Sequence, residues 1–345
     1  MAFNLHETLA AMGHEQLVIC NDAVSGLRAL IALHSTKLGP AIGGTRFWQY
    51  AREEEAVIDV LRLSRGMTYK NALADLPFGG GKAVIIGDQQ TKEREPIFRA
   101  LGRFVERLGG CFITAEDVGT SVTDMEYVRA ETSHVAGLAQ RSGDPSPWTA
   151  RGVFRALQAA AQHRWQSPDL SGKIVALQGC GNVGYHLARE LHQAGAKLTI
   201  SDFHAERVQQ AVREFDASAV APEKIHEIEA DVFAPCALGG GLNDQTIPLL
   251  HTQIVVGAAN NQLLQDRHGD MLRDRGITYV PDYLANAGGV INGCRELLGW
   301  ELTQSQQKIE EIFNTALAVL ALAEAEGIAA NRAADRIAER RFVDA

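Results

Sequence analysis

The stretch KIVALQGCGNVGYHLARELHQAGAKLTISD, residues 173–202, decides the fold. An apolar run (Ile174–Leu177) leads into the glycine-rich motif GCGNVG (Gly179–Gly184), and residues with the 3.6-residue periodicity of a helix follow. A second apolar run then ends at Asp202. A strand, a glycine turn, a helix and a strand in this order predict a βαβ unit with two parallel strands.

The glycine motif predicts a dinucleotide-binding site. Its glycines permit a tight turn and a close approach of the backbone to a pyrophosphate, whose charge then lies at the N-terminus of a helix. Asp202, 18 residues after Gly184, can accept hydrogen bonds from the ribose hydroxyls of adenosine. Because an acid here disfavours the additional phosphate of NADP, we expect NAD as the cofactor. Arg207 is the nearest alternative ligand for a phosphate, but a solvated charge on a helix is the simpler interpretation.

Apolar runs and helical stretches alternate along the rest of the chain, which predicts an α/β fold. In the second part we predict helices at 149–162, 183–193, 205–215 and 304–326, and strands at 174–177, 197–201, 231–234, 254–257 and 277–280. Since helices separate these strands, we expect a parallel sheet with helices on both faces. In the first part we predict strands at 17–22, 27–34, 83–87 and 112–115, and helices at 52–74, 96–108 and 124–132. The first two strands are close enough to pair as neighbours, so this sheet is expected to be mixed.

A polar run of turn-forming residues, RSGDPSP at 141–147, separates the two periodic regions and marks the expected domain boundary. The prediction is an N-terminal mixed-sheet α/β domain over residues 1–145 and a Rossmann dinucleotide-binding domain over 146–327. The C-terminal helix, about 328–345, is expected to pack back on the first domain.

Composition excludes several classes of partner. The 345-residue chain carries 42 acidic and 33 basic side chains, a net charge of −9 that would repel nucleic acids and anionic membrane surfaces. No apolar stretch reaches the ~18 residues of a membrane span, and the N-terminus lacks the pattern of a signal peptide. Five dispersed cysteines without metal-ligand spacing are expected to be reduced thiols. These features predict a soluble cytoplasmic protein with no nucleic-acid partner, no membrane partner and no metal site.

Two lysines and an aspartate in the first part of the chain are candidates for chemistry. Lys70 and Lys82 are twelve residues apart, and Asp117 lies just past a predicted strand. One lysine would bind a carboxylate. The other, its pKa lowered by its neighbour and by burial, would act on a reacting centre while Asp117 transfers protons. The glycines directly before Lys82, Gly79–Gly81, suit the close approach of a ligand.

Other interpretations of these residues are weaker. GGGK is reminiscent of a Walker A motif, but Leu76 stands where that motif needs its first glycine and Ala83 where it needs Ser or Thr. A lysine that holds pyridoxal phosphate would leave the dinucleotide motif without a purpose. Each charge taken singly could be a surface charge in a loop. The dinucleotide domain could belong to a catalytically inactive regulator, but such a protein needs no lysine pair.

Several long segments extend the comparison beyond single motifs: GPAIGGTRFW, LRLSRGMTYKNA, GGGKAVIIGD, ITAEDVGT, DPSPWTARGV, LQGCGNVGYHL, FAPCALGG, GAANNQL and PDYLANAGGVIN. In this order and spacing the chain resembles the amino-acid dehydrogenases of the glutamate, leucine, phenylalanine and valine group, most of all the leucine type. The resemblance covers nearly the whole chain. It implies two domains separated by a cleft that closes over the substrate. It also implies reversible NAD-dependent oxidative deamination of an apolar L-amino acid to its 2-oxo acid and ammonia.

The resemblance also implies roles for individual residues. Lys82 would be the catalytic lysine and Asp117 the general acid and base, while Lys70 and the backbone of Gly43 and Gly44 would hold the substrate carboxylate. The expected cofactor-binding residues are Thr149, Gly179, Gly181, Asn182, Val183, Gly184, Asp202, Ala237 and Asn260, of which Asn260 would also lie near the substrate carboxylate.

Four positions concern the substrate side chain. In glutamate-specific relatives a lysine stands at the position of Ile42, so a glutamate side chain would lack a partner here and glutamate is excluded. Ala115 and Val290 match the leucine type, whereas Gly293 replaces a valine of that type and opens space. Because a few methyl contacts change discrimination by only ~1–3 kcal/mol, these residues favour leucine and its branched-chain neighbours, with phenylalanine or tryptophan as the alternative.

The family forms homo-oligomers. This sequence ends at RRFVDA, without the longer tail of the octameric leucine-specific members, so we expect a dimer.

Overall fold

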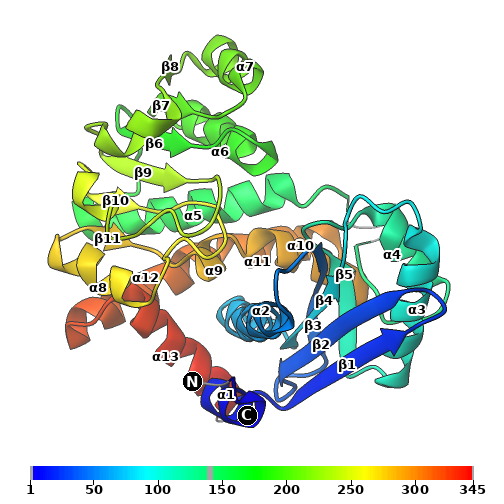
Figure 1. The fold of residues 1–345 in the computed structure, drawn as a ribbon. Helices are drawn as coiled ribbons and strands as arrows, with labels where there is room; N and C mark the ends of the chain where they lie inside the picture. The colour runs from blue at the N-terminus through cyan, green and yellow to red at the C-terminus, as the bar shows by residue number, and fades with distance from the viewer. Residues whose placement is uncertain (1–2, 138–142, 344–345) are drawn as a thin grey trace. The chain divides into compact units, whose positions relative to one another are not determined.

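The computed structural model describes residues 3–137 and 143–343 (Figure 1). The chain divides into two compact units. Unit 1 comprises the described residues of Met1–Gly143, Gly293–Gly299 and Ala338–Ala345, and unit 2 comprises Asp144–Asn292 and Trp300–Ile337. Residues 141–142 of the expected boundary segment and residues 344–345 of the expected C-terminal helix lie outside the described residues.

A five-stranded mixed sheet forms the centre of unit 1. Its strands are β1 (Gln16–Asp22), β2 (Leu27–Ser35), β3 (Ala41–Trp48), β4 (Gly79–Ile86) and β5 (Phe112–Glu116), in the order β1-β2-β4-β3-β5. β2 pairs antiparallel with β1 and β4, whereas β3 pairs parallel with β4 and β5. The predicted mixed sheet is therefore confirmed, but β3, which lies between β4 and β5, is absent from the sequence prediction.

Helices cover both faces of this sheet. The helices of unit 1 are α1 (Leu5–Met12), α2 (Glu53–Leu73), α3 (Arg94–Arg107) and α4 (Val122–Arg129). On one face Leu30 of β2 packs with Val60 of α2, and on the other face Ile31 packs with Leu101 of α3. Since successive side chains of a strand point to opposite faces, β2 must be apolar at nearly every position. This two-sided burial explains the continuous apolar run of its sequence.

Unit 2 contains a six-stranded parallel sheet. Its strands are β6 (Ile174–Gln178), β7 (Lys197–Ser201), β8 (Ser218–Ala219), β9 (Val232–Pro235), β10 (Ile254–Val255) and β11 (Thr278–Tyr279), in the order β11-β10-β9-β6-β7-β8. All five pairings are parallel, as predicted. The chain runs outward from β6 to β8 and then returns to the other side of β6 at β9. This reversal is the strand order of a Rossmann fold.

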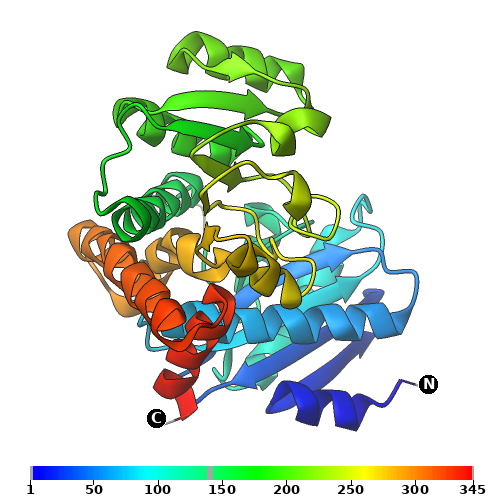
Figure 2. The same ribbon diagram turned by 90° about the vertical axis from the view of Figure 1, so that its left-hand side faces the viewer.

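The other α-helices of the described residues are α5 (Ser146–Trp165), α6 (Asn182–Gln193), α7 (Ala205–Phe215), α8 (Arg267–Asp274), α9 (Asp282–Ala285), α10 (Gly288–Leu298), α11 (Leu302–Glu310), α12 (Ile312–Glu326) and α13 (Ala330–Val343). Two short 3-10 helices, η1 (Pro222–Glu227) and η2 (Ile247–Leu249), complete the set. α5 packs against both α6 and α12 (Figure 2). The single helix predicted over 304–326 is two helices, α11 and α12. Glu311 between them keeps a right-handed helical backbone, so this local break leaves the apolar periodicity intact.

The end of α13 belongs to unit 1. The Tyr69 hydroxyl of α2 donates a 2.7 Å hydrogen bond to Glu339, and Arg341 donates one of 3.2 Å to the carbonyl oxygen of Leu73. The ring of Phe342 packs edge-on against those of His34 and Tyr69. The last turns of the chain are thus held by α2 and β2.

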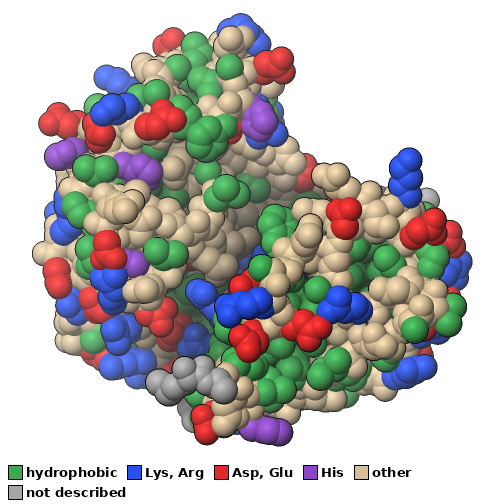
Figure 3. All heavy atoms as spheres, in the orientation of Figure 1, with side chains coloured by type: hydrophobic (Ala, Val, Ile, Leu, Met, Phe, Trp, Pro, Cys, Tyr) green, Lys and Arg blue, Asp and Glu red, His purple; other side chains and the backbone are tan. Residues whose placement is uncertain are grey.

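Within the described residues no single helix is both long and apolar enough to cross a bilayer. Leu302–Glu326 and Ala330–Val343 meet that criterion only as a pair, with a bend of 113° between them. On the face drawn in Figure 3, acidic and basic side chains lie interspersed over the surface.

Candidate active site

Lys82 and Asp117 form an ion pair in unit 1. Lys82 lies on β4 and Asp117 directly follows β5, and these two strands flank β3. Lys82 Nζ is 2.9 Å from Asp117 Oδ2, and the side chains are only 7% and 22% exposed. The structure therefore brings together the two residues expected to carry the chemistry, in an environment where water screens their attraction weakly.

Arg46 is a second cation beside Asp117. Its Nε atom is 3.4 Å from Asp117 Oδ2, and its Nη1 atom donates a 2.8 Å hydrogen bond to Asp59 Oδ2. The Tyr50 hydroxyl donates a hydrogen bond of 2.5 Å to the same oxygen of Asp59. A continuous chain of polar side chains therefore runs from Lys82 on β4 through β3 to Asp59 on α2.

The two cations determine the ionisation of Asp117. Burial alone would raise the pKa of its carboxyl, but the Lys82 ammonium and the Arg46 guanidinium outweigh burial and hold the pKa below its usual value. Asp117 is therefore a carboxylate at neutral pH and can accept a proton. Burial and the hydrogen bond to Asp59 raise the pKa of Tyr50 well above its ordinary value, so the phenol remains a donor.

The glycines before Lys82 serve the packing of the protein, and the expectation that Gly79–Gly81 admit a ligand is wrong. A Cβ atom at Gly79 would lie 1.9 Å from the carbonyl oxygen of Ser35, and one at Gly80 would lie 2.1 Å from the amide nitrogen of Thr68. All three glycines are buried inside a strand that begins at Gly79, four residues before the predicted start. They let β2 and α2 approach β4 closely.

Gly43 and Gly44 on β3 also meet a close neighbour. A Cβ atom at Gly43 would lie 1.9 Å from the carbonyl oxygen of Gly81, and one at Gly44 would lie 2.8 Å from Cβ of Asp117. The absence of a side chain at Gly44 therefore makes room for the Asp117 side chain.

The other expected substrate residues of unit 1 lie on adjoining elements. Lys70 is in the last turn of α2, which packs against β4. Ile42 is buried on β3, where the register pairs it with Gly80, and Ala115 is half-buried on β5, opposite Gly44. The strands and the helix that carry Lys82 and Asp117 thus also carry these three residues.

The glycine-rich turn of unit 2 lies between β6 and α6. Gly179 has a φ of +92°, in the left-handed region, and a Cβ atom at Gly184 would lie 2.1 Å from the carbonyl oxygen of Gly179. Gly181 differs, because the described atom nearest to a Cβ there is 3.8 Å away, on Arg207. The first and third glycines are therefore required by the fold, whereas the second leaves open space.

This open space lies at the N-terminus of a helix. Gly181 is the N-cap of α6, and Asn182 and Val183 form its first turn, where backbone N–H groups have no partner within the helix. Such donors, together with the positive end of the helix dipole, bind phosphate groups. The residues of the turn therefore fit the pyrophosphate of a dinucleotide.

Asp202 follows β7 and is tied to the same turn. Its carboxylate accepts hydrogen bonds from the backbone N–H groups of Cys180, at 2.7 Å, and His204, at 2.8 Å. The Asp202 side chain is 8% exposed, and Arg207 Nη1 is 3.9 Å from Asp202 Oδ2. Arg207 is half exposed, as the sequence interpretation holds, yet it also lies beside the candidate ribose site.

Ala237 and Asn260 lie in adjoining loops at the carboxyl ends of β9 and β10. Gly179 meets the first loop, since a Cβ atom there would lie 3.0 Å from the amide nitrogen of Ala237. Gly239 meets the second, since a Cβ atom there would lie 2.5 Å from the carbonyl oxygen of Asn260. β6 and β9 are the neighbours at which the strand order reverses, the place where Rossmann folds bind their ligands.

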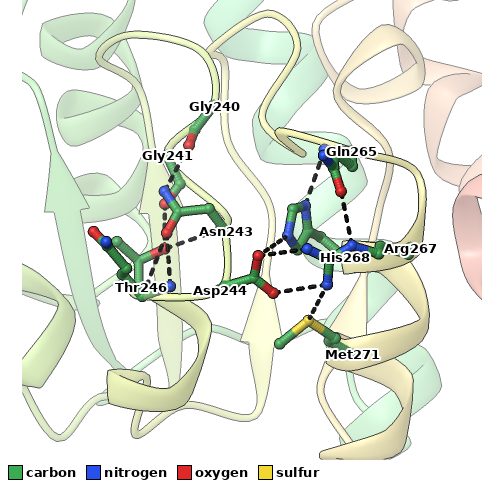
Figure 4. Close-up of polar contacts among 10 residues, drawn as sticks. Gly240, Gly241, Asn243, Asp244, Thr246, Gln265, Arg267, His268 and Met271 are labelled. Atoms are coloured by element: carbon green, nitrogen blue, oxygen red, sulfur yellow. Dashed lines mark hydrogen bonds and ion pairs between the residues drawn. The ribbon is translucent and has the colours of Figure 1, made fainter.

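Side chains of Asn243 and Thr246 hold the backbone at Gly240 and Gly241 (Figure 4). Asn243 donates to the carbonyl oxygen of Gly240 at 2.9 Å, and the Thr246 hydroxyl donates to that of Gly241 at 2.6 Å. Asp244 accepts from Arg267 at the start of α8. These contacts fix the part of the loop that follows Ala237.

Asn260 has a fixed amide orientation. Asn286 Nδ2 donates to the carbonyl oxygen of Ala258 at 3.1 Å and to Asn260 Oδ1 at 2.8 Å. Because a carbonyl can only accept, the Asn286 atom between them must be the NH2 group and the Asn260 atom facing it must be the oxygen. The exposed Asn260 side chain is left with its NH2 group as a donor for a ligand.

Thr149 lies beside the glycine pair that opens α10. A Cβ atom at Gly289 would lie 2.5 Å from Thr149 Oγ1. Val290 and Gly293 are three positions apart on α10, so both lie on one side of the helix. At Gly293 a Cβ atom would meet no heavy atom of the described residues within 4 Å. This position can accept a larger side chain or leave its space to a ligand.

Two histidines and two cysteines have structural roles or are unreactive. His14 bonds to Ser64 and to the carbonyl oxygen of Leu61, and buried His34 bonds to Thr68, so both have a structural role. Burial raises the pKa of the Cys180 thiol to about 11 and that of Cys236 to about 12, so neither is a thiolate at neutral pH.

Sequence analysis missed Arg46, Asp59, Tyr50 and Asn286. Arg46 and Asn286 belong to quoted segments, GGTR and LANAGG, and a polar side chain within such a segment is the signal that could have found them. Asp59 and Tyr50 give no such signal, because only the packing of α2 against the sheet brings them to Arg46.

A nucleotide-binding parallel sheet and a buried lysine–aspartate pair on one chain are features of a dehydrogenase. Sequence comparison defines the class further. Residues 14–134 match the profile described as "Glu/Leu/Phe/Val dehydrogenase, dimerisation domain", and residues 144–206 and 202–345 match "Glutamate/Leucine/Phenylalanine/Valine dehydrogenase". The chain belongs to this family of amino-acid dehydrogenases.

Three relatives span nearly the whole chain. A leucine dehydrogenase of Bacillus cereus is 51% identical over 99% of this chain and 94% of its own length. A valine dehydrogenase of Streptomyces virginiae is 49% identical over 96% of this chain and 95% of its own. The crystal structure of L-tryptophan dehydrogenase from Nostoc punctiforme superposes with a TM-score of 0.88, at 44% identity and 99% coverage of both chains. The protein is therefore an amino-acid dehydrogenase that acts on a small molecule and is similar to leucine, valine and tryptophan dehydrogenases over nearly its whole length.

Proposed function

We propose that the protein catalyses reversible NAD-dependent oxidative deamination of an apolar L-amino acid, with leucine and other branched-chain amino acids preferred. The observation that carries this proposal is the buried ion pair of Lys82 and Asp117, with 2.9 Å between Nζ and Oδ2. Unit 1 would bind the amino acid and perform the proton chemistry, and unit 2 would bind the cofactor.

Each group at the site has one task in this scheme. Lys70 and the backbone of Gly43 and Gly44 hold the substrate carboxylate. After a hydride has left Cα, water would add to that carbon and ammonia would leave. Lys82 would polarise the oxygen that comes from this water, and Asp117 would take up and return the protons. The nicotinamide cofactor supplies the acceptor for the hydride. Gly179–Gly184, Asp202, Ala237, Thr149 and Asn260 would hold that cofactor.

We infer NAD over NADP from Asp202. Its carboxylate is held at the end of β7 by two backbone N–H groups, and an added phosphate on the ribose would lie against this negative charge. Arg207, 3.9 Å away, offsets part of that charge. We expect initial rates with NAD to exceed those with NADP at equal concentration, and equal or faster rates with NADP would show that Asp202 does not select the cofactor.

The residues expected around the substrate side chain support a small apolar substrate. Ile42 offers no charge to a glutamate side chain, and Ala115 and Val290 are of the leucine type. The relatives act on leucine, valine and tryptophan by their names, so they support an apolar substrate without separating these three. The open space at Gly293 favours the alternative substrates, phenylalanine and tryptophan.

A comparison of kcat/KM for Leu, Val, Ile, Phe and Trp tests the substrate. We expect the branched-chain amino acids to lead, and a tenfold preference for an aromatic amino acid would show that Gly293 dominates the pocket. Gly293→Val should then shift the ratio of Leu to Phe toward Leu by about 1–3 kcal/mol.

A second class of function is a cofactor-binding regulator without catalysis. NAD mixed with the panel of L-amino acids distinguishes the two. NADH formation supports the enzyme, whereas cofactor binding without NADH from any amino acid supports the regulator.

We also propose a homodimer in the cytoplasm. β1 is the outer strand of its sheet, so one edge of its backbone lacks a strand partner among the described residues, and Ile19 on it is 71% exposed. The profile that matches this region is described as a dimerisation domain. Light scattering should return twice the monomer mass, and a mass near eight monomers would contradict the dimer.

A further inference from the structure

Arg46 lies between two carboxylates. Its Nε faces Asp117 Oδ2 at 3.4 Å and its Nη1 bonds to Asp59 Oδ2 at 2.8 Å. The Arg46 side chain is 21% exposed and that of Asp59 is 26% exposed, so both contacts are partly shielded from water. A planar guanidinium can serve both acceptors at once, which the single ammonium of a lysine does less well.

This arrangement gives Arg46 a counter-charge in both protonation states of Asp117. With Asp117 ionised, two cations (Lys82 and Arg46) face two anions (Asp117 and Asp59). When Asp117 takes up a proton, Lys82 loses an anion, but Arg46 keeps Asp59 as its partner. Arg46 is therefore not left without a counter-charge at the step in which Asp117 is neutral.

Further groups bear on this chain of charges. The Tyr50 hydroxyl donates to Asp59 and fixes the oxygen that Arg46 uses. Glu55 and Arg62 of α2 line the hollow that exposes Arg46 and Asp59. Glu116 on β5 precedes Asp117, and burial together with nearby carboxylates raises the pKa of Glu116. Arg62 is exposed and has the same charge as Arg46, which makes it a matched control.

We propose that Arg46 and Asp59 are positioning residues that hold Asp117 against Lys82 and set how easily Asp117 takes up a proton. This role rests on the proposed function, in which Asp117 is the acid and base. Arg46 stabilises the carboxylate form, and Asp59 limits that stabilisation because it competes for the same guanidinium. Loss of the two residues should therefore act on Asp117 in opposite directions.

Carboxyl 13C NMR of labelled aspartate tests this without turnover. The titration is followed in a Lys82→Gln background, which removes the other cation and moves the midpoint of Asp117 upward into the range where the protein is folded. Asp117→Asn assigns the resonance. We expect Arg46→Gln to raise the midpoint by about one pH unit, Asp59→Asn to lower it by a smaller amount, and Arg62→Gln to leave it in place.

Any other pattern overturns the proposal, including shifts of the same sign or equal shifts in the Arg62→Gln control. Asp59→Asn is isosteric, so it decides the matter alone if Arg46→Gln does not fold. With Lys82 intact, both variants should lower kcat more than they change KM, and Arg46→Gln should move the acid limb of kcat/KM to higher pH. If the titrations behave as expected while the wild type oxidises no amino acid, the proposed function fails and the role of Arg46 in the ionisation of Asp117 stands.

Discussion

In unit 1 the candidate site consists of charged side chains, with Lys82 Nζ and Arg46 Nε at 2.9 and 3.4 Å from one oxygen of Asp117. In unit 2 the site is largely backbone, a turn in which Gly181 leaves space at the start of α6. The two regions should therefore fail in different ways. Removal of a side chain in unit 1 takes away a reacting group, whereas addition of a methyl group in unit 2 takes away room for a ligand.

The largest effect is expected at Lys82. Lys82→Ala should lower kcat by about 10³- to 10⁴-fold, the range for loss of a positioned acid–base group. Asp117 keeps Arg46 as a partner in this variant, so the protein should still fold. Cofactor binding to unit 2, followed by NADH fluorescence, should be unchanged. If Lys82→Ala weakened NADH binding by a factor similar to its loss of kcat, the distinction between the two units would be wrong.

The next largest effect is expected at Gly181 and Gly184 in the glycine-rich turn of unit 2. Gly181→Ala should weaken cofactor binding about tenfold or more, about 1.4 kcal/mol, and leave the Tm in place because its methyl group meets no described atom within 3.8 Å. Gly184→Ala should instead lower the free energy of unfolding by about 1–3 kcal/mol, because its methyl group would overlap the carbonyl oxygen of Gly179. Calorimetry with and without NAD measures both. Equal loss of Tm in the two variants would contradict the separate roles of these glycines.

A smaller effect is expected at Asn286, which sharpens the comparison because it is a side chain that acts in unit 2. Asn286→Ala frees the amide of Asn260 to turn, and the loss of one hydrogen bond should weaken cofactor or substrate binding about 2- to 10-fold, or 0.5–1.5 kcal/mol. Steady-state KM values for both ligands give the measurement. If neither KM changes, the orientation of Asn260 is fixed by the loop and not by Asn286.

The last of these predictions concerns acid stability in unit 1, away from the reacting groups. Burial lowers the pKa of His14 to about 4 and that of His34 to about 3, so both are neutral in the folded protein at pH 6. The unfolded chain binds these protons below about pH 6.5, and the free energy of unfolding therefore falls as pH drops from 6.5 toward 4.

Denaturant unfolding at pH 7 and pH 5 checks this sign. His34→Gln should lose less stability between these two values than the wild type loses. His6→Gln, which changes an exposed histidine, is the control and should behave like the wild type. An identical loss in all three proteins would show that other groups control the acid dependence.

Sequence periodicity predicted the parallel sheet of unit 2 but not β3 of unit 1. The apolar runs of β6, β7 and β9 are bounded by turns and helices, so each strand is recognisable by itself. β3 contains Gly43 and Gly44, residues that weaken a strand pattern because they offer no side chain for packing. The structure shows that these glycines are required by contacts with β4 and Asp117, which lie far away in the sequence.

The candidate site was predictable where a residue belongs to a motif, and less so where a contact depends on tertiary packing. Lys82, Asp117 and the glycine turn were found from local sequence and its resemblance to a family. The partner of Arg46 on α2, Asp59, lies 13 residues from it in the chain, and no local rule connects a strand residue with that position of a helix. The interpretation of Gly79–Gly81 failed for the same reason, because sequence alone does not distinguish a glycine packed by protein from one open to a ligand.

Transfer of the isotope at the substrate carbon tests the central claim most directly. The wild-type protein is mixed with NAD and L-leucine that carries deuterium at Cα, and the products are analysed by mass spectrometry. The account predicts 4-methyl-2-oxopentanoate, ammonia and NADH that carries the deuterium, with no product from Lys82→Ala in the same time. Absence of NADH with leucine and every other apolar amino acid, or deuterium released to water and not found in NADH, would contradict it.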